Sequence, residues 1–544
     1  TKHMGSYMQQ YGYKFTLSLT PLKDAYFEKL DFDSAKHGDK KIVYIFLSIA
    51  LLILLIACIN FMNLSTIRAI ERSKEVGMRK VLGASRSHLI GQFIGESLLL
   101  TFFACFIAIG LLFLCMPLYN ELLGYELNVS WNTSSVWFFL TGLILLIGLV
   151  AGGYPAFFLA GFSPIQALKE KLKLGKGSLF RQALVVIQFC ISVFLIIGTI
   201  VVSKQMSYLK HKNLGYDEEQ TVIVPINNSA IYDHIKSFKA DLQNDPAIAS
   251  VSLMSGEPGG YFDGQMFEVD EHTERWKGRT AFADFDYVKT LGLKVIAGRD
   301  FSSAYTTDST DAVLINRTAA TQLGWTPEKA IGKWIRNTVR DDVKRRVIGV
   351  VEDFNFLSLK DNIEPLIISP NEDWRVILIK LNAGSLQAGV DKIKHIYMEA
   401  ASDYPFEYRF LDQQFDNLYK NDLRQQTLLS VFAGLAIFIA CLGLFGLASF
   451  TATKRIKEIG VRKVLGSSVH NIVILLSRDL LRPVLIATCL ALPISYYVMN
   501  NWLQNFAYKT SLHWWIFLFA ALVTFVIALT TVGVKAVKAA LANP

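Results

Sequence analysis

The chain alternates between long apolar stretches and polar segments. Seven apolar runs with almost no internal charge lie at residues 42–64, 92–116, 136–160, 183–203, 428–450, 481–500 and 514–534. Each is close to the roughly 20 residues that a helix needs to cross the hydrocarbon core of a bilayer. A large soluble core could bury one such helix, but not seven. The pattern therefore predicts a polytopic α-helical membrane protein with seven spans, in a chain that is 52% hydrophobic.

Basic residues gather beside these spans. Twenty Lys and Arg, against five Asp and Glu, lie in four short segments: 65–88, 161–182, 452–482 and 533–544. The whole chain has a net charge of only +9, so its remainder is negative. A nucleic-acid-binding protein carries its basic residues on one face of a domain, whereas this distribution follows the positive-inside rule. We therefore expect these segments in the cytoplasm and no nucleic-acid partner.

If those segments lie in the cytoplasm, the other connections between spans lie on the extracytoplasmic side. The loop 117–135 contains no Lys or Arg, and the large polar stretch 204–427 lies on the same side. Residues 1–41 also fall outside, although they carry no signal peptide and do not begin with methionine. We therefore expect a chain that continues upstream through at least one more span.

Two segments match at a constant offset of 383 residues. Residues 74–83 read KEVGMRKVLG and residues 457–466 read KEIGVRKVLG, so eight of ten positions are identical. The register continues without gaps into the neighbouring spans, where Glu96 corresponds to Asp479. Basic loops that are alike by chance would not keep register across a span. The chain therefore contains a duplication, with a first copy at 42–160 and a second copy at 428–544.

Each repeated segment predicts a short helix between two spans. Neither segment contains proline, and Gly83 and Gly466 are placed to end the helices. The charged residues give each helix a face suited to docking. A juxtamembrane helix held by anionic headgroups is the alternative, but headgroups require neither the glycines nor the repeated carboxylate.

The pattern K-E-x-G-x-R-K-V-L-G between spans resembles the signature of the FtsX/MacB-like ABC permease family. In that family the segment is the coupling helix that contacts the cytoplasmic ATPase. Tyr154-Pro155-Ala156 resembles the family's permease ending, and Val351-Glu352-Asp353-Phe354-Asn355-Phe356 is similar to the duplicated permeases common in Bacteroidota. The resemblance covers nearly the whole chain. The resemblance is incomplete at the N-terminal end, where only a short remnant of the family's first extracytoplasmic domain is expected.

The resemblance implies which residues couple the chain to its ATPase. They are Lys74, Glu75, Gly77, Arg79, Lys80 and Gly83 in the first copy and Lys457, Glu458, Gly460, Arg462, Lys463 and Gly466 in the second. Glu96 and Asp479 are expected as carboxylates at the cytoplasmic membrane interface, either anchoring the span or pairing with nearby Arg86 or Arg478. A proton or ion pathway would more usually place such groups near mid-membrane.

The resemblance also implies how the chain divides into domains. We expect a remnant of the first extracytoplasmic domain (1–41), an FtsX-like permease domain (42–160), a cytoplasmic linker (161–182), a span (183–203), a MacB-like extracytoplasmic domain with stalk helices (204–427) and a second FtsX-like permease domain (428–544). Each permease domain would contain three spans.

The extracytoplasmic domain has its own pattern. Polar helical stretches at 203–213 and 412–426 predict the stalk. Two β-α-β units, at 220–254 and 374–411, predict an α/β sandwich, and short strands with glycine turns at 280–368 predict an inserted subdomain. This is similar to the two-lobed MacB periplasmic domain. His234 and His272 are too isolated to predict a metal site.

No segment has the spacing of an ATP-binding loop. G-x-x-x-x-G-K-[ST] is absent, and the nearest stretch, 324–334, has too long a spacing and no hydroxyl after Lys333. We therefore expect a chain that is not an enzyme and holds no cofactor itself. ATP would be bound by a separate cytoplasmic ABC ATPase, present in two copies with one at each coupling helix.

The resemblance implies a type VII permease subunit that couples ATP hydrolysis to movement outside the membrane and exports a peptide, antibiotic or lipid. FtsX-like signalling to cell-wall hydrolases and lipoprotein release stay open as alternatives. A periplasmic adaptor or a hydrolase would then be a further partner. The implied location is the plasma membrane, as the inner membrane of a Gram-negative bacterium.

Overall fold

The computed structural model describes residues 21, 26–27, 38, 40–124, 126–160, 175–340, 342–382, 384, 386–465 and 467–541. Most of the expected remnant 1–41 and residues 161–174 of the expected linker lie outside this range. The chain divides into two compact units. The first comprises 1–195, 431–491 and 521–544, and the second comprises 196–430 and 492–520.

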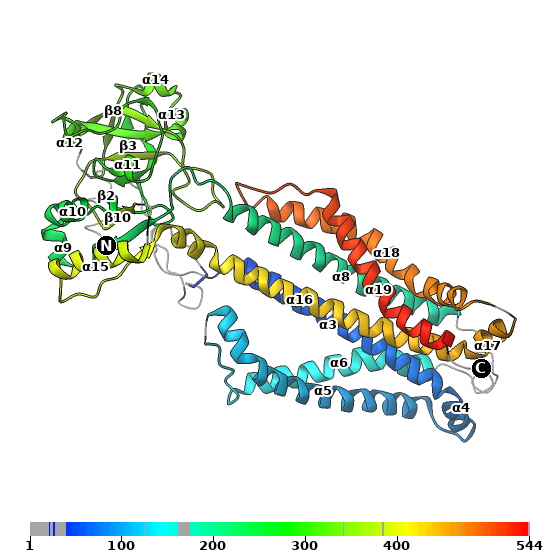
Figure 1. The fold of residues 1–544 in the computed structure, drawn as a ribbon. Helices are drawn as coiled ribbons and strands as arrows, with labels where there is room; N and C mark the ends of the chain where they lie inside the picture. The colour runs from blue at the N-terminus through cyan, green and yellow to red at the C-terminus, as the bar shows by residue number, and fades with distance from the viewer. Residues whose placement is uncertain are drawn as a thin grey trace. The chain divides into compact units, whose positions relative to one another are not determined.

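The described part of the first unit is helical (Figure 1). Its helices, some of which continue into the second unit, are α3 (Lys40–Glu71), α4 (Ser73–Val81), α5 (Arg86–Leu123), α6 (Ser134–Ala160), α8 (Gly175–Lys210), α16 (Leu411–Lys454), α17 (Ile456–Val464), α18 (Val469–Leu503) and α19 (Trp514–Leu541). Among the described residues, six helices are long and apolar enough to span a membrane: α3, α5, α6, α8, α16 and α19.

The remaining predicted run, 481–500, lies within α18. This helix is 35 residues long, but its first half carries Arg478, Asp479 and Arg482. It is not among the six that meet the criterion of length and apolarity. A span through α18 therefore stays a prediction.

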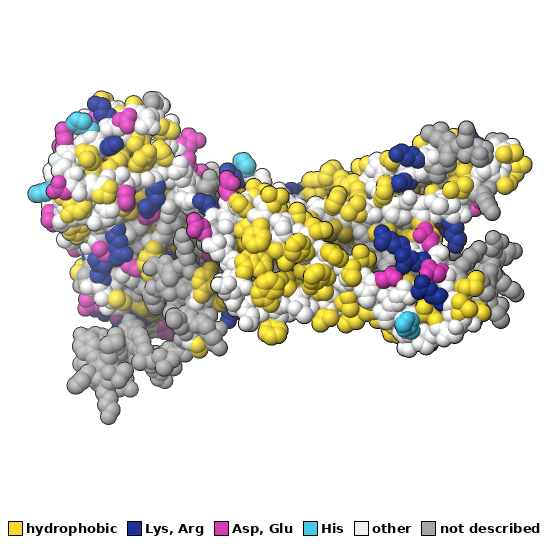
Figure 2. Space-filling view, turned by 90° about the horizontal axis from the view of Figure 1, so that it is seen from below, with side chains coloured by type: hydrophobic (Ala, Val, Ile, Leu, Met, Phe, Trp, Pro, Cys, Tyr) yellow, Lys and Arg dark blue, Asp and Glu magenta, His cyan; other side chains and the backbone are white. Residues whose placement is uncertain are grey.

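Apolar side chains occupy much of the face of these helices that Figure 2 shows. On α5, for example, Phe106 and Leu114 are both more than 70% exposed. An apolar surface this continuous would be costly in water, but it suits contact with lipid chains. The same view shows Lys, Arg, Asp and Glu gathered toward one end of the helices.

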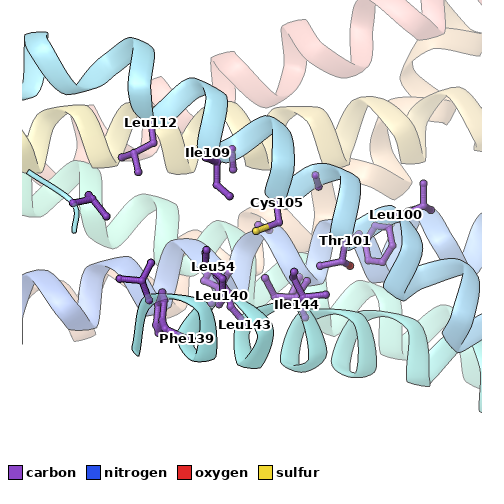
Figure 3. Close-up of a pocket in the computed structure, with 18 of the residues that line it drawn as sticks. Leu54, Leu100, Thr101, Cys105, Ile109, Leu112, Phe139, Leu140, Leu143 and Ile144 are labelled. Carbon is purple, nitrogen blue, oxygen red and sulfur yellow. The ribbon is translucent and has the colours of Figure 1, made fainter. Parts of the chain in front are cut away.

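Small residues allow α5 and α6 to approach closely. Gly148, Gly152 and Ala156 recur every four residues along α6. A Cβ atom on Gly148 would lie 2.5 Å from Cδ2 of Leu98, and one on Gly152 would lie 2.5 Å from Oγ of Ser97. Such stripes bring helices together where lipid removes the hydrophobic driving force. Farther along, α3, α5 and α6 line an open apolar cavity of about 830 Å³ (Figure 3).

The second unit contains two sheets. Sheet A has the strand order β11-β1-β10-β2 and is antiparallel between neighbours. Its elements are β1 (Thr221–Pro225), α9 (Ser229–Asp233), α10 (Ile235–Gln243), β2 (Ile248–Met254), β10 (Val376–Leu381), α15 (Leu386–Ala400) and β11 (Arg409–Phe410). These are the two predicted β-α-β units, and the strand order shows that they interleave. The last strand is shorter than the predicted 405–411.

Helix α10 covers sheet A because its apolar residues fall on one face. Ile235, Phe238 and Leu242 follow the helical repeat and are buried with the sheet residues Val222 and Ile379. Helix α15 adds Val390, Ile393 and Tyr397 to the same core.

Sheet B is inserted between β2 and β10. Its strands are β3 (Asp263–Val269), β4 (Trp276–Phe282), β5 (Val295–Gly298), β6 (Ala312–Asn316), β7 (Trp334–Asn337), β8 (Lys344–Val351) and β9 (Leu366–Ser369), with short helices α11 (Tyr287–Thr290), α12 (Asp308–Asp311), α13 (Arg317–Gln322) and α14 (Pro327–Ala330). The strand order is β5-β8-β6-β9-β4-β3-β7, and an additional β7–β8 pairing closes six strands into a ring. An inserted, strand-rich subdomain is therefore present, and it begins earlier than the predicted residue 280.

Candidate functional site

The two repeated segments form short helices at one end of the first unit. Helices α4 and α17 are each nine residues long and lie at corresponding positions of the two copies (Figure 1). Each directly follows a long apolar helix, α3 or α16. The predicted helices are therefore present, and the repeat places them where the basic residues gather.

Both helices end in the same way. Gly83 has a φ of +96°, which favours glycine, and Ala84 donates to the carbonyl of Arg79 at 2.9 Å. In the second copy Ser467 donates to the carbonyl of Arg462 at 2.9 Å. Gly466 itself lies outside the described residues.

The inner face of each helix is fixed by one buried aliphatic residue. Val76 in α4 and Ile459 in α17 are repeat equivalents, and both are buried. Ile459 packs against Ile472 of α18 and Ala536 of α19. Gly77, next to Val76, is also buried, whereas its equivalent Gly460 is half-buried.

The outer face of each helix exposes large apolar side chains. The three positions are the same in both copies, and each residue is between 54% and 80% exposed: Met78, Val81 and Leu82 in the first copy and Val461, Val464 and Leu465 in the second. We call these residues the two apolar knobs. Exposed apolar clusters rimmed by polar residues mark sites of protein interaction.

The predicted glutamates pair within their own helices. Glu75 accepts from Arg79 at 2.6 Å, and the equivalent Glu458 lies 2.8 Å from Arg462. Both pairs are exposed and separated by one helical turn, so each contributes only about 0.3–0.5 kcal/mol to stability. The side chains of Lys74 and Lys457 lie outside the described residues.

Glu96 and Asp479 also form equivalent ion pairs. Glu96 accepts from Arg72 at 2.9 Å, and Asp479 accepts from Arg455 at 2.9 Å. These partners differ from the Arg86 and Arg478 that proximity in the sequence suggests. Arg72 and Arg455 are 383 residues apart, as are Glu96 and Asp479. The offset of the repeat could therefore have indicated both ion pairs. Each pair connects the end of one long helix with the start of another.

The two copies differ in how these pairs are connected. In the first copy Gln92 accepts from Arg79 at 2.9 Å and donates to Glu96 at 3.0 Å, which links the ion pairs into one network. The equivalent of Gln92 is Leu475, which can make no such link.

Lys80 follows Arg79, and partial burial together with the nearby Arg86 lowers the pKa of Lys80. Lys463, its equivalent, is half-buried.

A second group of contacts lies in the second unit, where α8 contacts the loop 504–513 and Lys360 bridges this loop to α16. Gln205 of α8 is fully buried, donates to the carbonyl of Tyr508 at 2.8 Å and accepts from the amide of Thr510 at 2.8 Å. The amide of Ala507 donates to the carbonyl of Lys360, which is also paired with Asp422 of α16 at 2.8 Å. We call these contacts the stalk junction.

Metal chemistry has no support in the described part of the chain. No group of three or more His, Cys, Asp or Glu side chains there could hold a metal ion.

Two family models match the chain. The FtsX-like permease C-terminal domain matches residues 47–164 and 430–544, and the MacB-like periplasmic core domain matches residues 183–402. The first model therefore matches both copies, and the second matches a region that contains sheet B and three of the four strands of sheet A. Both models describe parts of permeases, which confirms the expectation that this chain is not the ATPase.

Curated relatives match over shorter stretches. An uncharacterized ABC transporter permease, YknZ of Bacillus subtilis, is 34% identical over 125 residues, which is 22% of this chain and 30% of the relative. The macrolide export ATP-binding/permease protein MacB of Bdellovibrio bacteriovorus is 34% identical over 122 residues, which is 22% of this chain and 18% of the relative. The matches thus span less than a third of either relative.

Solved structures match part of the chain. The periplasmic region of MacB from Actinobacillus actinomycetemcomitans is 17% identical, with a TM-score of 0.29, and the match covers 38% of this chain and 97% of that one. The extracellular domain of the ABC-type transporter YknZ from Gram-positive bacteria is 13% identical, with a TM-score of 0.25, and the match covers 35% and 98%.

These observations agree on a membrane protein with a domain outside the membrane. The long apolar helices, the duplicated permease match and the periplasmic core match all lie in one chain. The chain belongs to the FtsX-like ABC transporter permeases that carry a MacB-like periplasmic core domain.

Proposed function

We propose that this chain couples ATP hydrolysis by a separate cytoplasmic ABC ATPase to movement of its extracytoplasmic domain. The observation that carries the proposal is the pair of apolar knobs. Three large apolar residues stand exposed at the same positions of both copies, on helices that are otherwise basic. A helix with an exposed apolar face is suited to a hydrophobic groove on a partner.

Two equivalent knobs suggest two equivalent partners. An ABC ATPase dimer would present one groove to each knob, while Glu75 with Arg79, and Glu458 with Arg462, would form the charged rim. Charged rims steer association and orientation more than they add affinity. The glutamates are already paired inside the helix, so their contribution would be to orientation.

We infer that movement travels along the long helices. Closure of the ATPase dimer would push α4 and α17. The ion pairs Arg72–Glu96 and Arg455–Asp479 would transmit this displacement to the neighbouring long helices. Helices α8 and α16 would transmit it to the stalk junction. No aqueous pore is needed for this mechanism.

The direct test replaces the centre of both knobs. Leu82→Asp combined with Leu465→Asp should abolish co-purification of the ATPase, because an aspartate cannot enter an apolar groove without losing hydration. The permease should stay folded, since both leucines are about 80% exposed. Val339→Asp, at an exposed position of the extracytoplasmic domain, is the control. Normal co-purification of the double variant would exclude the knobs as the docking site.

Export of a peptide, antibiotic or lipid is the proposed outcome of the movement, in the plasma membrane. Similarity to macrolide export proteins supports export. Signalling to a cell-wall hydrolase and release of lipoproteins are the alternatives. ATP hydrolysis that rises when a candidate cargo is added to the reconstituted complex would support export, whereas a hydrolase bound to residues 204–427 would support signalling.

A further inference from the structure

A cavity of about 610 Å³ lies in the second unit, and residues associated with both sheets line it. Lys236 and Lys239 come from α10, which covers sheet A. Residues 284–286 follow β4 of sheet B, and residues 302–303 follow β5. The volume is within the range of about 300–1,000 Å³ that is usual for small-molecule sites.

Lys239 forms ion pairs with two of the carboxylates that line this cavity. Its Nζ lies 2.7 Å from Oδ2 of Asp284, and it also pairs with Asp286. Asp284 accepts further hydrogen bonds from the hydroxyl of Ser252 at 2.8 Å and from the amide of Leu253 at 2.8 Å. Both oxygens of Asp284 are therefore occupied, and its side chain is only 11% exposed.

Asp286 retains one oxygen for a ligand. Lys239 and Gln243 both donate to Oδ2 of Asp286, whereas no residue in the described part of the chain donates to its Oδ1. The side chain of Asp286 is 32% exposed. A carboxylate oxygen offers about two acceptor positions, so Oδ1 can accept hydrogen bonds from an ammonium group that enters the cavity.

Aromatic rings line the same cavity. Phe285 is the residue before Asp286, and its ring stacks on that of Phe301 with the ring centroids 5.7 Å apart. The indole of Trp374 lines the cavity as well. An ammonium group within about 6 Å of an aromatic ring is attracted to the face of that ring, and an apolar group of the same ligand would pack against the rings. The lining therefore suits an amphipathic cation.

The charges of the lining favour a cation over an anion. Among the described residues that line the cavity, the carboxylates are Asp284, Asp286 and Glu372, and the ammonium groups are Lys236 and Lys239. Lys236 pairs with Glu372 at 2.7 Å, so both lysines already have carboxylate partners. An anionic ligand would have to compete with these carboxylates and would be repelled by them.

We propose that this cavity binds a small amphipathic amine, with its ammonium group at Oδ1 of Asp286 and its apolar or aromatic group against Phe285 and Trp374. The ligand would contact residues associated with both sheets at once. The proposal concerns the extracytoplasmic domain alone, and it does not rest on docking of the ATPase to the apolar knobs.

The test measures binding of 2-phenylethylamine to the full chain in lipid nanodiscs by ligand-observed NMR, with empty nanodiscs as the blank and no ATPase present. At pH 7 this amine carries a positive charge beside an aromatic ring. The neutral analogue 2-phenylethanol has the same ring and no charge. The amine should bind at least about tenfold more tightly than the alcohol, because its hydrogen bond to Asp286 is charge-assisted.

Asp286→Asn should weaken binding of the amine about tenfold. Lys239 keeps its pair with Asp284 in this variant, so the unfolding midpoint should show a folded domain. Glu328→Gln, at an exposed position of α14, removes a carboxylate outside the cavity and should leave binding unchanged.

A variant with the opposite sign keeps the test decisive if Asp286→Asn does not fold. Lys236→Gln removes a cation from the lining and leaves Glu372 without that partner, so the amine should bind about two- to fivefold more tightly. The side chain of Lys236 is 74% exposed, so this variant should fold. Equal binding of the amine and the alcohol, full binding by folded Asp286→Asn, or unchanged or weaker binding by Lys236→Gln would overturn the proposal.

Discussion

Asn60 and Gly443 occupy equivalent positions of the two copies, and they lie against each other. A Cβ atom on Gly443 would be 2.7 Å from Oδ1 of Asn60 and 3.3 Å from Nε2 of Gln188. Asn60 also donates through Nδ2 to the carbonyl of Ile439 at 3.4 Å. The two copies have therefore diverged at this position, with asparagine in the first and glycine in the second. Because Gly443 has no side chain, α3 and α16 can approach closely here.

Gly443→Ala should consequently destabilise the helical unit. The methyl group would have to displace the buried Asn60 and Gln188, and overpacking of this kind costs about 1–3 kcal/mol. Gly434→Ala on the same helix is the matched control, because no atom lies within 4 Å of its Cβ position. Thermal unfolding in detergent should show a lower midpoint for Gly443→Ala alone, and equal midpoints for both variants would refute this packing.

Asp300 gives the extracytoplasmic domain a dependence on pH. Burial raises the pKa of this carboxyl to about 6, and the nearby Asp286 and Asp308 also raise it, while the amide of Phe301 and Arg299 act against them. An acid whose pKa is raised by folding is protonated more readily in the folded state. Stability contributed by this group is therefore greatest at low pH and falls as pH rises toward the folded pKa.

Asp300→Asn should accordingly stabilise the protein at pH 7.5 and have little effect at pH 4.5. The measurement is the difference in unfolding midpoint between the variant and the unchanged chain at each pH. Asp308→Asn should differ, because the hydrogen bond from Arg299 lowers the pKa of Asp308. That variant should destabilise the protein at both pH values, since stability from a lowered pKa is lost only as the pH falls below the ordinary carboxyl pKa. A midpoint difference for Asp300→Asn that does not change with pH would contradict the assignment.

At the scale of elements, the repeat made helices α4 and α17 predictable from the sequence. Eight identical positions at a fixed offset indicated both helices, and their bounds agree with 74–83 and 457–466 to within a few residues. The exposure of the apolar knobs was not predictable from the sequence. Val81 and Leu82 are of residue types that are usually buried, and only the packing shows which face of α4 is covered. Long-range pairing has no local signal, so the closed ring of sheet B could not be predicted from glycine turns and short strands.

Glu75→Gln combined with Glu458→Gln tests the charged rim separately from the knobs. Each exposed pair contributes little to folding, so the unfolding midpoint of the permease should stay the same. The ATPase should still bind through the knobs but lose its regulation by the permease, because its orientation would no longer be fixed. Glu121→Gln, at the other end of α5, is the control. Fully regulated ATP hydrolysis by the double variant would exclude a role for these carboxylates.

At the scale of the whole molecule, the stalk junction is the point where movement would reach the extracytoplasmic domain. Gln205→Leu would leave the carbonyl of Tyr508 and the amide of Thr510 without a hydrogen bond to this side chain. Losing buried partners costs about 1–3 kcal/mol. We expect an active ATPase whose hydrolysis no longer responds to ligands of the extracytoplasmic domain. An unchanged response would show that Gln205 is not needed for transmission.

The central claim is that the nucleotide state of the ATPase changes the extracytoplasmic domain through α4 and α17. Hydrogen exchange of the permease–ATPase complex at residues 504–513, with and without vanadate-trapped nucleotide, tests it most directly. The account predicts a nucleotide-dependent change in protection there, and no change when Leu82→Asp and Leu465→Asp are combined. Identical protection in both nucleotide states of the unaltered complex would contradict it.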